Sequence, residues 1–344
     1  MRPVALDAMG GDHAPEATVA GAVRAARESG IAVLLVGHRR ELEERLEGHA
    51  PVPDQVEVVH AETTIGMEES PGPALLRKRD SSIFVAIDLV KEGRASAVVS
   101  MGNSGAAMGA ATLRLGLVPG VDRPALAMVM PSRGGGVVVL DCGAVVDCRP
   151  QHLCDFAQMG SMYAHHLLHR DSPRVGLLSV GSEESKGNTV TKKAHPLLAK
   201  LPINFVGNVE GHEIAQGEVD VVVCDGFVGN AILKATEGYA ELFWNMLKER
   251  LDVGWWRRVG AWLLRPTLHD ISRQLNYASY GGALLVGVKG ICIIGHGRST
   301  PAAVSSALCM ASRLADQGVV EELIASRSGT EMSAVESAVG QDLD

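Results

Sequence analysis

A hydroxyl, a cation and an amide stand next to one another in the run Ser185-Lys186-Gly187-Asn188, just before a helical pattern that begins at Thr189. The free backbone N–H groups at the start of a helix favour an anion, and glycine lets the backbone approach a ligand closely. One interpretation of this loop is therefore a phosphate or similar oxyanion site. An exposed turn with an ordinary N-cap is the other, and these four residues alone do not decide between them.

Two more loops have the same character. Asn103 and Ser104 lie between two glycines, and Gly229 and Asn230 end the run Asp225-Gly226-Phe227-Val228-Gly229-Asn230. Each loop follows an apolar run and precedes a helical pattern, which by itself is typical of a tight turn. Three such loops in one chain favour the binding of an oxyanion.

His13 lies in a fourth polar loop, between Asp12 and Ala14. An imidazole there could exchange a proton or donate a hydrogen bond to an anion. It could equally cap the next helix or hold the turn. Both interpretations remain open at this point.

Short apolar runs alternate with amphipathic stretches along most of the chain. This alternation predicts a three-layer α/β/α fold with a mainly parallel sheet. Because ligands bind beyond the carboxyl ends of parallel strands, we expect the polar loops to converge on one site. The predicted strands are 4–7, 31–36, 56–60, 97–100, 125–130, 137–141, 175–179, 203–207, 219–224 and 291–294, and the clearest predicted helices are 16–28, 39–47, 150–169 and 301–317.

The chain of 344 residues is interpreted as one catalytic domain, 1–325, that includes a helical excursion. The strand pattern disappears over 237–272, where a long amphipathic helix is followed by a segment rich in Trp and Arg. Residues 326–344 are rich in Ser, Gly and acidic side chains and predict a disordered tail.

All four Trp residues fall between Trp244 and Trp262, although the chain is only 4% aromatic. Trp prefers the bilayer interface, and Arg attracts anionic headgroups. The segment therefore predicts a peripheral membrane contact, with a dimer contact as the alternative. The residues predicted to touch the membrane are Trp255, Trp256, Trp262 and Leu263, and the neighbouring basic residues are Arg257, Arg258 and Arg265.

Composition and motifs exclude several classes of protein. A net charge of -8 argues against a nucleic-acid binder. The six cysteines lack the spacing of a zinc site and are expected to be reduced thiols in a cytoplasmic protein, and we expect no metal. The dinucleotide G-x-G-x-x-G, the full Walker A sequence and the G-x-S-x-G elbow are absent, as are a signal peptide and a membrane-spanning run.

Taken in order, the loops closely resemble the PlsX family, the acyl-acyl-carrier-protein:phosphate acyltransferases of bacterial phospholipid synthesis. The resemblance covers about residues 2–316. It rests on Leu6-Asp7-Ala8-Met9-Gly10-Gly11-Asp12-His13-Ala14-Pro15, Gly102-Asn103-Ser104-Gly105-Ala106, Asp141-Cys142-Gly143-Ala144, Asp147-Cys148-Arg149-Pro150, Glu183-Glu184-Ser185-Lys186-Gly187-Asn188, Gly207-Asn208-Val209-Glu210-Gly211 and Cys224-Asp225-Gly226-Phe227-Val228-Gly229-Asn230.

The resemblance implies a fold like that of isocitrate and isopropylmalate dehydrogenases and phosphotransacetylases, a homodimer without a cofactor, and a place on the inner face of the cell membrane. It implies that inorganic phosphate attacks the thioester of a long-chain acyl carrier protein. The acyl phosphate formed would then serve a glycerol-3-phosphate acyltransferase.

We expect Lys186 and Asn188 to hold phosphate, with Asn103 and Asn230 donating to phosphate or to the oxyanion. His13 and Asp225 are expected to orient groups or to exchange a proton. Ser104, Ser185, Gly187 and Gly229 complete the predicted binding loops. Arg257, Arg258 and Arg265 are also candidates for docking the acidic carrier protein.

The chain departs from the family pattern in two places. Ser279-Tyr280-Gly281-Gly282-Ala283-Leu284 stands where Glu-Tyr-Gly-Gly-Ala-Pro is expected, and Arg298 in His296-Gly297-Arg298-Ser299 stands where a small residue is usual. Three other functions are alternatives for this sequence: a soluble phosphotransacetylase acting on acyl-CoA, an NAD-dependent decarboxylating dehydrogenase, and a non-catalytic membrane-surface scaffold for acyl carriers.

Overall fold

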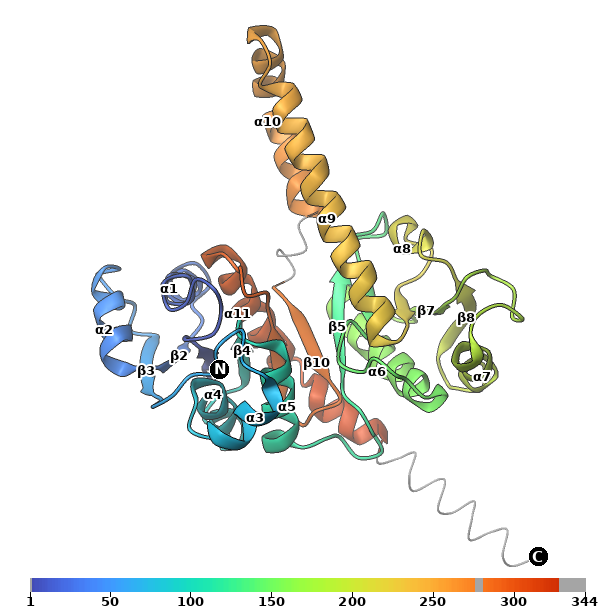
Figure 1. The fold of residues 1–344 in the computed structure, drawn as a ribbon, viewed down its shortest axis with the longest axis horizontal. Coiled ribbons are helices and arrows are strands. Elements are labelled where there is room, and N and C mark those ends of the chain that lie inside the picture. Colours follow the sequence, from blue (N-terminus) through green and yellow to red (C-terminus); the bar gives the residue numbers. More distant parts are fainter. Residues whose placement is uncertain (1, 276–280, 328–344) are drawn as a thin grey trace, which may run out of the picture.

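A computed structural model describes residues 2–275 and 281–327 and shows one α/β/α body from which a helical hairpin projects (Figure 1). The strands are β1 (Val4–Asp7), β2 (Val33–Gly37), β3 (Val56–His60), β4 (Ala97–Ser100), β5 (Ala125–Met130), β6 (Val137–Leu140), β7 (Arg174–Leu178), β8 (Asn204–Val209), β9 (Val221–Val223), β10 (Ala283–Val286) and β11 (Ile291–Ile294). The helices are α1 (Glu16–Ser29), α2 (Arg39–Glu47), α3 (Pro71–Arg77), α4 (Ser82–Lys91), α5 (Ser104–Leu115), α6 (Pro150–Leu168), α7 (Thr189–Leu198), α8 (Glu213–Gln216), α9 (Gly226–Leu251), α10 (Trp255–Leu275) and α11 (Pro301–Asp316).

The strands form one sheet in the order β3-β2-β1-β4-β11-β10-β5-β6-β9-β7-β8. Several strands, such as β1, β4 and β6, are buried over their whole length, as expected of strands covered on both faces. One apolar layer joins the sheet to α1, α2, α6, α7 and α11. The other joins it to α3, α4, α5 and the start of α9. The predicted three-layer fold with a mainly parallel sheet is confirmed.

The two ends of the sheet run in opposite directions. The group from β3 to β11 is parallel, and so is the group from β6 to β8. Between them, β10 is antiparallel to β11 and to β5, and β5 is antiparallel to β6. The carboxyl ends of the two groups therefore lie at opposite edges, and the expectation that all polar loops converge on one site by the parallel-strand rule is wrong.

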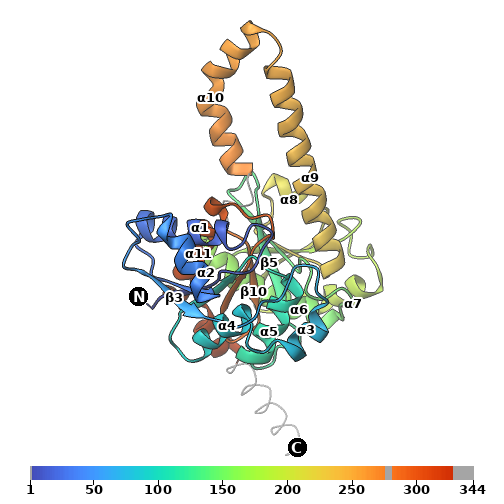
Figure 2. The same ribbon diagram turned by 60° about the vertical axis from the view of Figure 1, so that its left-hand side comes forward.

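The predicted strands and the four predicted helices are present, with end shifts of a few residues. The strand β10 and the helices α3, α4 and α8 were not predicted. The long helix α9 begins at Gly226, well before the predicted start of the excursion at 237. Its first turns lie against the body, and the rest forms the projecting hairpin with α10 (Figure 2).

A helical segment at 319–327 follows α11, so residues 326 and 327 do not belong to a disordered tail. Arg327 makes a 2.9 Å ion pair with Asp155 on α6, and both side chains are largely buried. The rest of the predicted tail, 328–344, lies outside the described residues.

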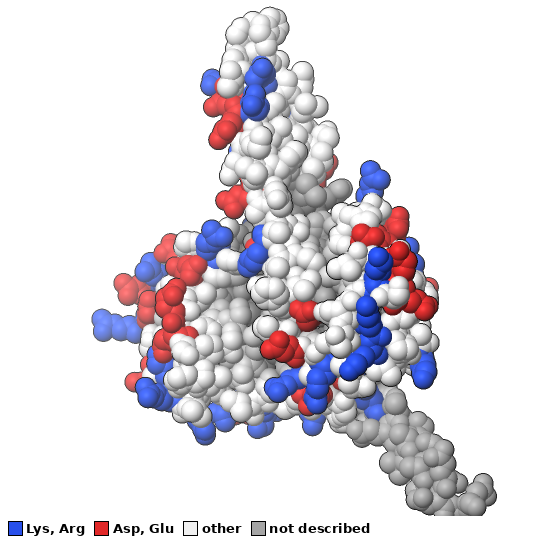
Figure 3. Space-filling view, turned by 45° about the vertical axis from the view of Figure 1, so that its right-hand side comes forward, with Lys and Arg blue, Asp and Glu red and all other residues white. Residues whose placement is uncertain are grey.

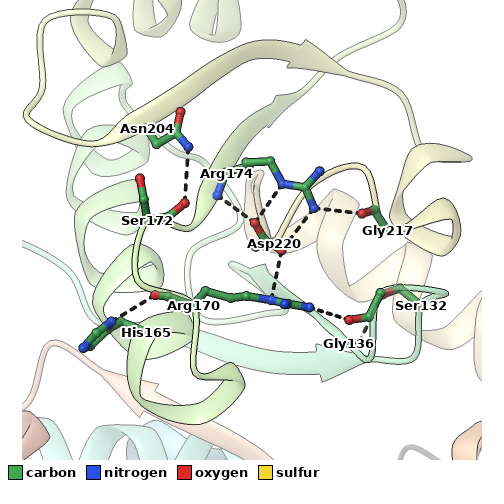
Figure 4. A network of polar contacts seen from close by, with 10 residues as sticks. Ser132, Gly136, His165, Arg170, Ser172, Arg174, Asn204, Gly217 and Asp220 are labelled. Atoms are coloured by element: carbon green, nitrogen blue, oxygen red, sulfur yellow. Dashed lines mark hydrogen bonds and ion pairs between the residues drawn. The ribbon is translucent and has the colours of Figure 1, made fainter.

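An ion-pair network joins β7 to the start of β9 (Figure 4). The Asp220 carboxylate, nearly buried, accepts hydrogen bonds from the backbone N–H and the Nε of Arg174, both at 2.9 Å, and lies 3.4 Å from Nε of Arg170. Burial opposes ionisation of Asp220, but its hydrogen bonds with Arg174 outweigh burial and lower its pKa.

We expect Asp220→Asn to lower the free energy of unfolding by about 2 kcal/mol near neutral pH, because charge-assisted hydrogen bonds are lost. The folded-state pKa lies below the unfolded value of 3.8. The stabilisation is thus present above the unfolded pKa and lost as pH falls through the folded pKa. Denaturant titrations of both proteins over acidic pH should show the difference shrinking, and a constant difference would contradict this assignment.

Candidate active site

Four of the polar loops end in side chains that cap helices. Asn103 accepts from the backbone N–H of Ala106, Asn188 from those of Val190 and Thr191, Asp225 from that of Val228, and Thr300 from that of Ala303. These are typical N-cap contacts, which satisfy N–H groups that the helix itself leaves free. Capping thus explains part of the polar pattern in the sequence, and it fixes the helix N-termini that border the site.

The start of α9 lies unusually close to the loop that follows β6. A Cβ atom placed on Gly229 would lie 1.9 Å from the carbonyl oxygen of Asp141, and one on Gly226 would lie 2.6 Å from Oδ2 of Asp141. The loop itself is organised by the buried Asp141 carboxyl, which accepts from the backbone N–H groups of Leu126, Gly143, Ala144 and Val145. Glycine is therefore required at 226 and 229 for space.

The first turns of α9 separate two cavities. Cavity A has a volume of about 430 Å³ and lies over the central strands β5 and β10. Its lining comes from the loop between β3 and α3, the start of α5, β5, α9, β10, and the segment from β11 into α11. The lining residues are Met67, Ser104, Leu126, Met128, Asn230, Leu233, Lys234, Glu237, Gly281, Gly282, Ala283, Ile294, Gly295, His296, Gly297, Arg298, Ser299, Thr300 and Ala303.

Cavity A is suited to an anion. Ser104 is the first residue of α5 and Thr300 caps α11, so the positive ends of two helices border the cavity. Lys234 and Arg298 add cations, and Asn230 adds an amide. Lys234 makes a 3.0 Å ion pair with Glu237, whose side chain is 15% exposed. The ion pair holds the ammonium group of Lys234 at the cavity wall.

The loop around His296 is fixed to its surroundings. Gly295 donates a backbone hydrogen bond to Ser100, and Asp12 donates one to Gly297, both at 2.8 Å. Burial, followed by the charge of Lys234, lowers the pKa of His296. The imidazole is therefore neutral at physiological pH.

Cavity B, of about 480 Å³, lies on the other side of α9 at the carboxyl ends of β7 and β9. Gly187, Asn188 and Asp225 line it, together with Cys148 and Cys224. Burial, and next the charge of Asp141, raises the pKa of Cys148 to about 12. Burial likewise raises the pKa of Cys224. Both cysteines are therefore thiols at neutral pH and poor nucleophiles.

The structure divides the predicted site residues between the two cavities. Ser104 and Asn230 line cavity A, and Gly187, Asn188 and Asp225 line cavity B. Gly229 is buried between them against Asp141.

Three predicted residues, His13, Ser185 and Lys186, are exposed and line neither cavity as the described residues define them. His13 nevertheless follows Asp12, whose backbone is bound to Gly297 at cavity A.

Asn103 has a role that the sequence did not indicate. Its Nδ2 donates to the carbonyl oxygens of Met67 and Glu69 at 3.1 and 2.9 Å, while its Oδ1 caps α5. This side chain therefore holds the 66–69 loop, and with it Met67, at the edge of cavity A. Because both ends of the amide are engaged, Asn103 positions the site and is not a free donor.

Sequence reasoning missed Lys234, Glu237 and His296. Lys234 and Glu237 follow Asn230 by one and two helical turns, so an early start of α9 would have placed all three on one face. His296 follows the strand β11 in the polar run Gly295-His296-Gly297-Arg298-Ser299-Thr300. That pattern matches the loops that were singled out, but His296 and Arg298 were considered only as part of a family motif.

The predicted membrane and docking residues lie on the hairpin, from its tip to the middle of α10, where Arg265 lies. Trp255, Trp256 and Trp262 are between 62% and 72% exposed, and Leu263 is also exposed. Arg257 donates to the backbone of Arg250, and Arg258 pairs with Asp252 at 3.0 Å. The face of the hairpin in Figure 3 is mostly uncharged, with Lys, Arg and acidic side chains gathered toward its end. Within the described residues, no helix has the length and apolarity needed to cross a bilayer.

Solved structures define the class of fold. A phosphotransacetylase from Streptococcus pyogenes matches with a TM-score of 0.62 and 15% identity, covering 92% of this chain and 94% of that one. A 4-hydroxythreonine-4-phosphate dehydrogenase from Klebsiella pneumoniae matches with a TM-score of 0.55 and 14% identity, covering 92% of this chain and all of that one. The chain is thus an α/β/α protein of the fold that phosphotransacetylases share with these dehydrogenases.

Sequence comparison narrows this class to a family. The family model described as "Fatty acid synthesis protein" matches residues 2–322. A protein of Desulfitobacterium hafniense (strain Y51) named "Phosphate acyltransferase" is 47% identical to this chain, over 94% of this chain and 96% of that protein. A protein of Nostoc punctiforme with the same name is 48% identical, over 93% of this chain and 95% of that protein. The chain belongs to this fatty acid synthesis protein family, the PlsX family of phosphate acyltransferases, and the predicted family is confirmed.

Proposed function

We propose that this protein transfers a long-chain acyl group from the thioester of an acyl carrier protein to inorganic phosphate, and that phosphate binds in cavity A. The observation that carries the proposal is the convergence of Lys234, Asn230 and the N-termini of α5 and α11 on one cavity. A phosphate oxygen attacks the carbonyl carbon, the carbon–sulfur bond breaks, and the acyl phosphate and the carrier thiol leave. Phosphate is itself the nucleophile, in keeping with the neutral thiols of Cys148 and Cys224 beside cavity B.

In this arrangement Lys234 and the two helix N-termini offset the charge of phosphate, and Asn230 orients it by hydrogen bonding. Asn103 acts indirectly by holding the wall of the cavity. The alternative placement puts phosphate in cavity B, where Asn188 lies and where the exposed Lys186 could reach from the adjoining loop. The two placements differ in which lysine the reaction requires.

The donor is tested by measuring phosphate-dependent release of free thiol from a palmitoyl carrier protein and from palmitoyl-CoA. The proposal expects kcat/KM to favour the carrier protein by at least about tenfold, a difference of ~1.4 kcal/mol in transition-state stabilisation. Equal or greater efficiency with the coenzyme A ester would instead support a soluble phosphotransacetylase, the second candidate.

The hairpin is proposed to touch an anionic membrane on the cytoplasmic side. Trp255 and Trp256 stack with ring centroids 3.5 Å apart and, with Trp262, expose large aromatic surfaces beside Arg257. The tip lies about 30 Å along α9 from Asn230, because 21 residues separate Asn230 from Leu251 at ~1.5 Å each. That distance favours the membrane over the carrier protein as the partner of Arg257 and Arg258. Arg265 lies ten residues into α10, part of the way back toward the body, so the distance does not decide its partner.

Replacing Trp255 and Trp256 together by serine should weaken binding to vesicles that contain phosphatidylglycerol at least about tenfold, because the apolar contact is lost. Charge reversal, Arg257→Glu with Arg258→Glu, should do the same through lost headgroup attraction. Vesicle flotation measures both. Neither change should alter KM for the carrier protein in the absence of vesicles, and a raised KM would assign these arginines to carrier docking.

Two further partners belong to the proposal. A homodimer is proposed, and light scattering of the purified protein tests it by giving the mass in solution. The product is a mixed anhydride of a fatty acid and phosphoric acid, which an acyltransferase acting on glycerol 3-phosphate would consume. Vesicle binding would place the release of this product near the bilayer.

A further inference from the structure

His296 lies at the cavity in which phosphate is proposed to bind. It lines cavity A, is half-buried, and stands on the loop between β11 and α11. Four charged residues influence this ring: Lys234, Arg298, Glu237 and Asp12. None of the predictions made from the sequence gave His296 a role, and the phosphate contacts proposed above do not use it.

The backbone defines which ring nitrogen carries the proton. The Nδ1 atom accepts a hydrogen bond from the backbone N–H of Arg298 at 3.2 Å. A nitrogen that accepts in this way has its lone pair engaged, so in the neutral ring the proton resides on Nε2. Nδ1 is thus unavailable as a base, and Nε2–H is a donor.

The loop holds this donor in place before substrate arrives. Ser299 donates a backbone hydrogen bond to the carbonyl of His296 at 2.9 Å. The two neighbouring glycines are bonded at 2.8 Å, Gly295 to the end of β4 and Gly297 to the loop after β1. The backbone around His296 therefore need not reorganise during the reaction. Donors fixed in this way stabilise the charge that develops in a transition state more than they stabilise the ground state.

We propose that His296, as a neutral imidazole, donates its Nε2–H to the oxyanion that forms when phosphate attacks the thioester carbonyl. The inference rests on the proposed function. In the step that His296 assists, an oxygen atom of phosphate forms a bond to the carbonyl carbon and the carbonyl π electrons move onto the carbonyl oxygen. The proton of His296 stays on Nε2 throughout. Collapse of the oxyanion then expels the thiolate, which takes its proton from solvent.

Three variants test this role: His296→Ala, His296→Gln and, as a matched control, His212→Ala, which changes an exposed histidine that lines neither cavity. Loss of one oxyanion donor should lower kcat by about 10²- to 10³-fold in His296→Ala, with little change in the KM for phosphate. His296→Gln, which retains an N–H donor of similar reach, should recover at least about tenfold of that loss. The control should match the wild type.

The pH profile separates a donor from an acid or base. If His296 is a neutral donor, the kcat profile of His296→Gln keeps the shape of the wild-type profile between about pH 5 and 8. If His296 transfers a proton, His296→Gln is as impaired as His296→Ala and one limb of the profile disappears, which overturns the inference. An unchanged kcat in His296→Ala also overturns it.

The proposed function can fail separately. Formation of acyl phosphate by the wild-type protein tests the reaction itself, whereas the variants test only the role of His296. Thermal unfolding of each variant shows whether the fold is retained. If His296→Ala unfolds at a lower temperature, His296→Gln still decides the matter through its kcat and its pH profile.

Discussion

Replacing Lys234 by alanine is expected to reduce kcat/KM for phosphate by about a thousandfold, or ~4 kcal/mol of transition-state stabilisation. Lys234 supplies a cation at the wall of cavity A. Without it the carboxylate of Glu237, whose side chain is 15% exposed, has lost its ion-pair partner and repels phosphate from the cavity. Steady-state kinetics with varied phosphate concentration measure the effect.

Two lysine variants make this result specific. Lys193→Ala changes an exposed lysine of α7 that lines neither cavity, and it should retain wild-type activity. Lys186→Ala separates the two placements of phosphate. Full activity in Lys234→Ala together with a large loss in Lys186→Ala would move the phosphate site to cavity B.

Gly229→Ala is expected to abolish activity and to destabilise the protein. The new methyl group would lie 1.9 Å from the carbonyl oxygen of Asp141, far inside contact distance, so α9 must move away from the loop after β6. Asn230 and Lys234 would move with α9 and leave cavity A. Overpacking of this kind costs about 1 to 3 kcal/mol or more, and an ångström of displacement at the site costs far more in rate.

Gly238→Ala is the matched control on the same helix. A methyl group there meets nothing within 4 Å, so only the helix propensity changes, and a gain of about 0.5 to 1 kcal/mol is expected. Chemical denaturation and activity should be measured for both variants. If Gly229→Ala were as stable and active as Gly238→Ala, the close approach of α9 to Asp141 would not be needed for the site.

Local patterns in the sequence predicted most of the sheet and most of the helices. Runs such as Val4–Asp7 and Ala97–Ser100 are short, apolar and bounded by turns, and all their residues are buried. The strand β10 escaped prediction because it follows two glycines and begins Ala283-Leu284-Leu285, residues that favour a helix more than a strand. Its antiparallel pairing with β11 and with β5 joins strands from distant parts of the chain, which no local pattern encodes. The reversal between the two ends of the sheet lies at the antiparallel pairing of β5 with β6.

The site was predicted only in part, because some of its residues are brought together by tertiary packing. Asn103, Asn188 and Asp225 were predicted as site residues because they are polar and precede helices. All three are N-caps, so the pattern that predicted a binding site is also the pattern of helix capping. Lys234 and Glu237 sit inside a helix, where a Lys-Glu pair usually indicates a solvated face. Only the close packing of α9 on the body brings this pair to a cavity.

The most direct test of the account supplies the purified protein with palmitoyl carrier protein and radiolabelled inorganic phosphate. Extraction into organic solvent then separates labelled acyl phosphate from free phosphate. Labelled acyl phosphate is expected in an amount equal to the carrier thiol released, at a rate proportional to the concentration of wild-type enzyme. The Lys234→Ala protein should form it about a thousandfold more slowly at low phosphate concentration, and the Lys193→Ala protein at the wild-type rate. Thiol release without labelled acyl phosphate, or equal labelling by the Lys234→Ala protein, would contradict phosphate transfer in cavity A.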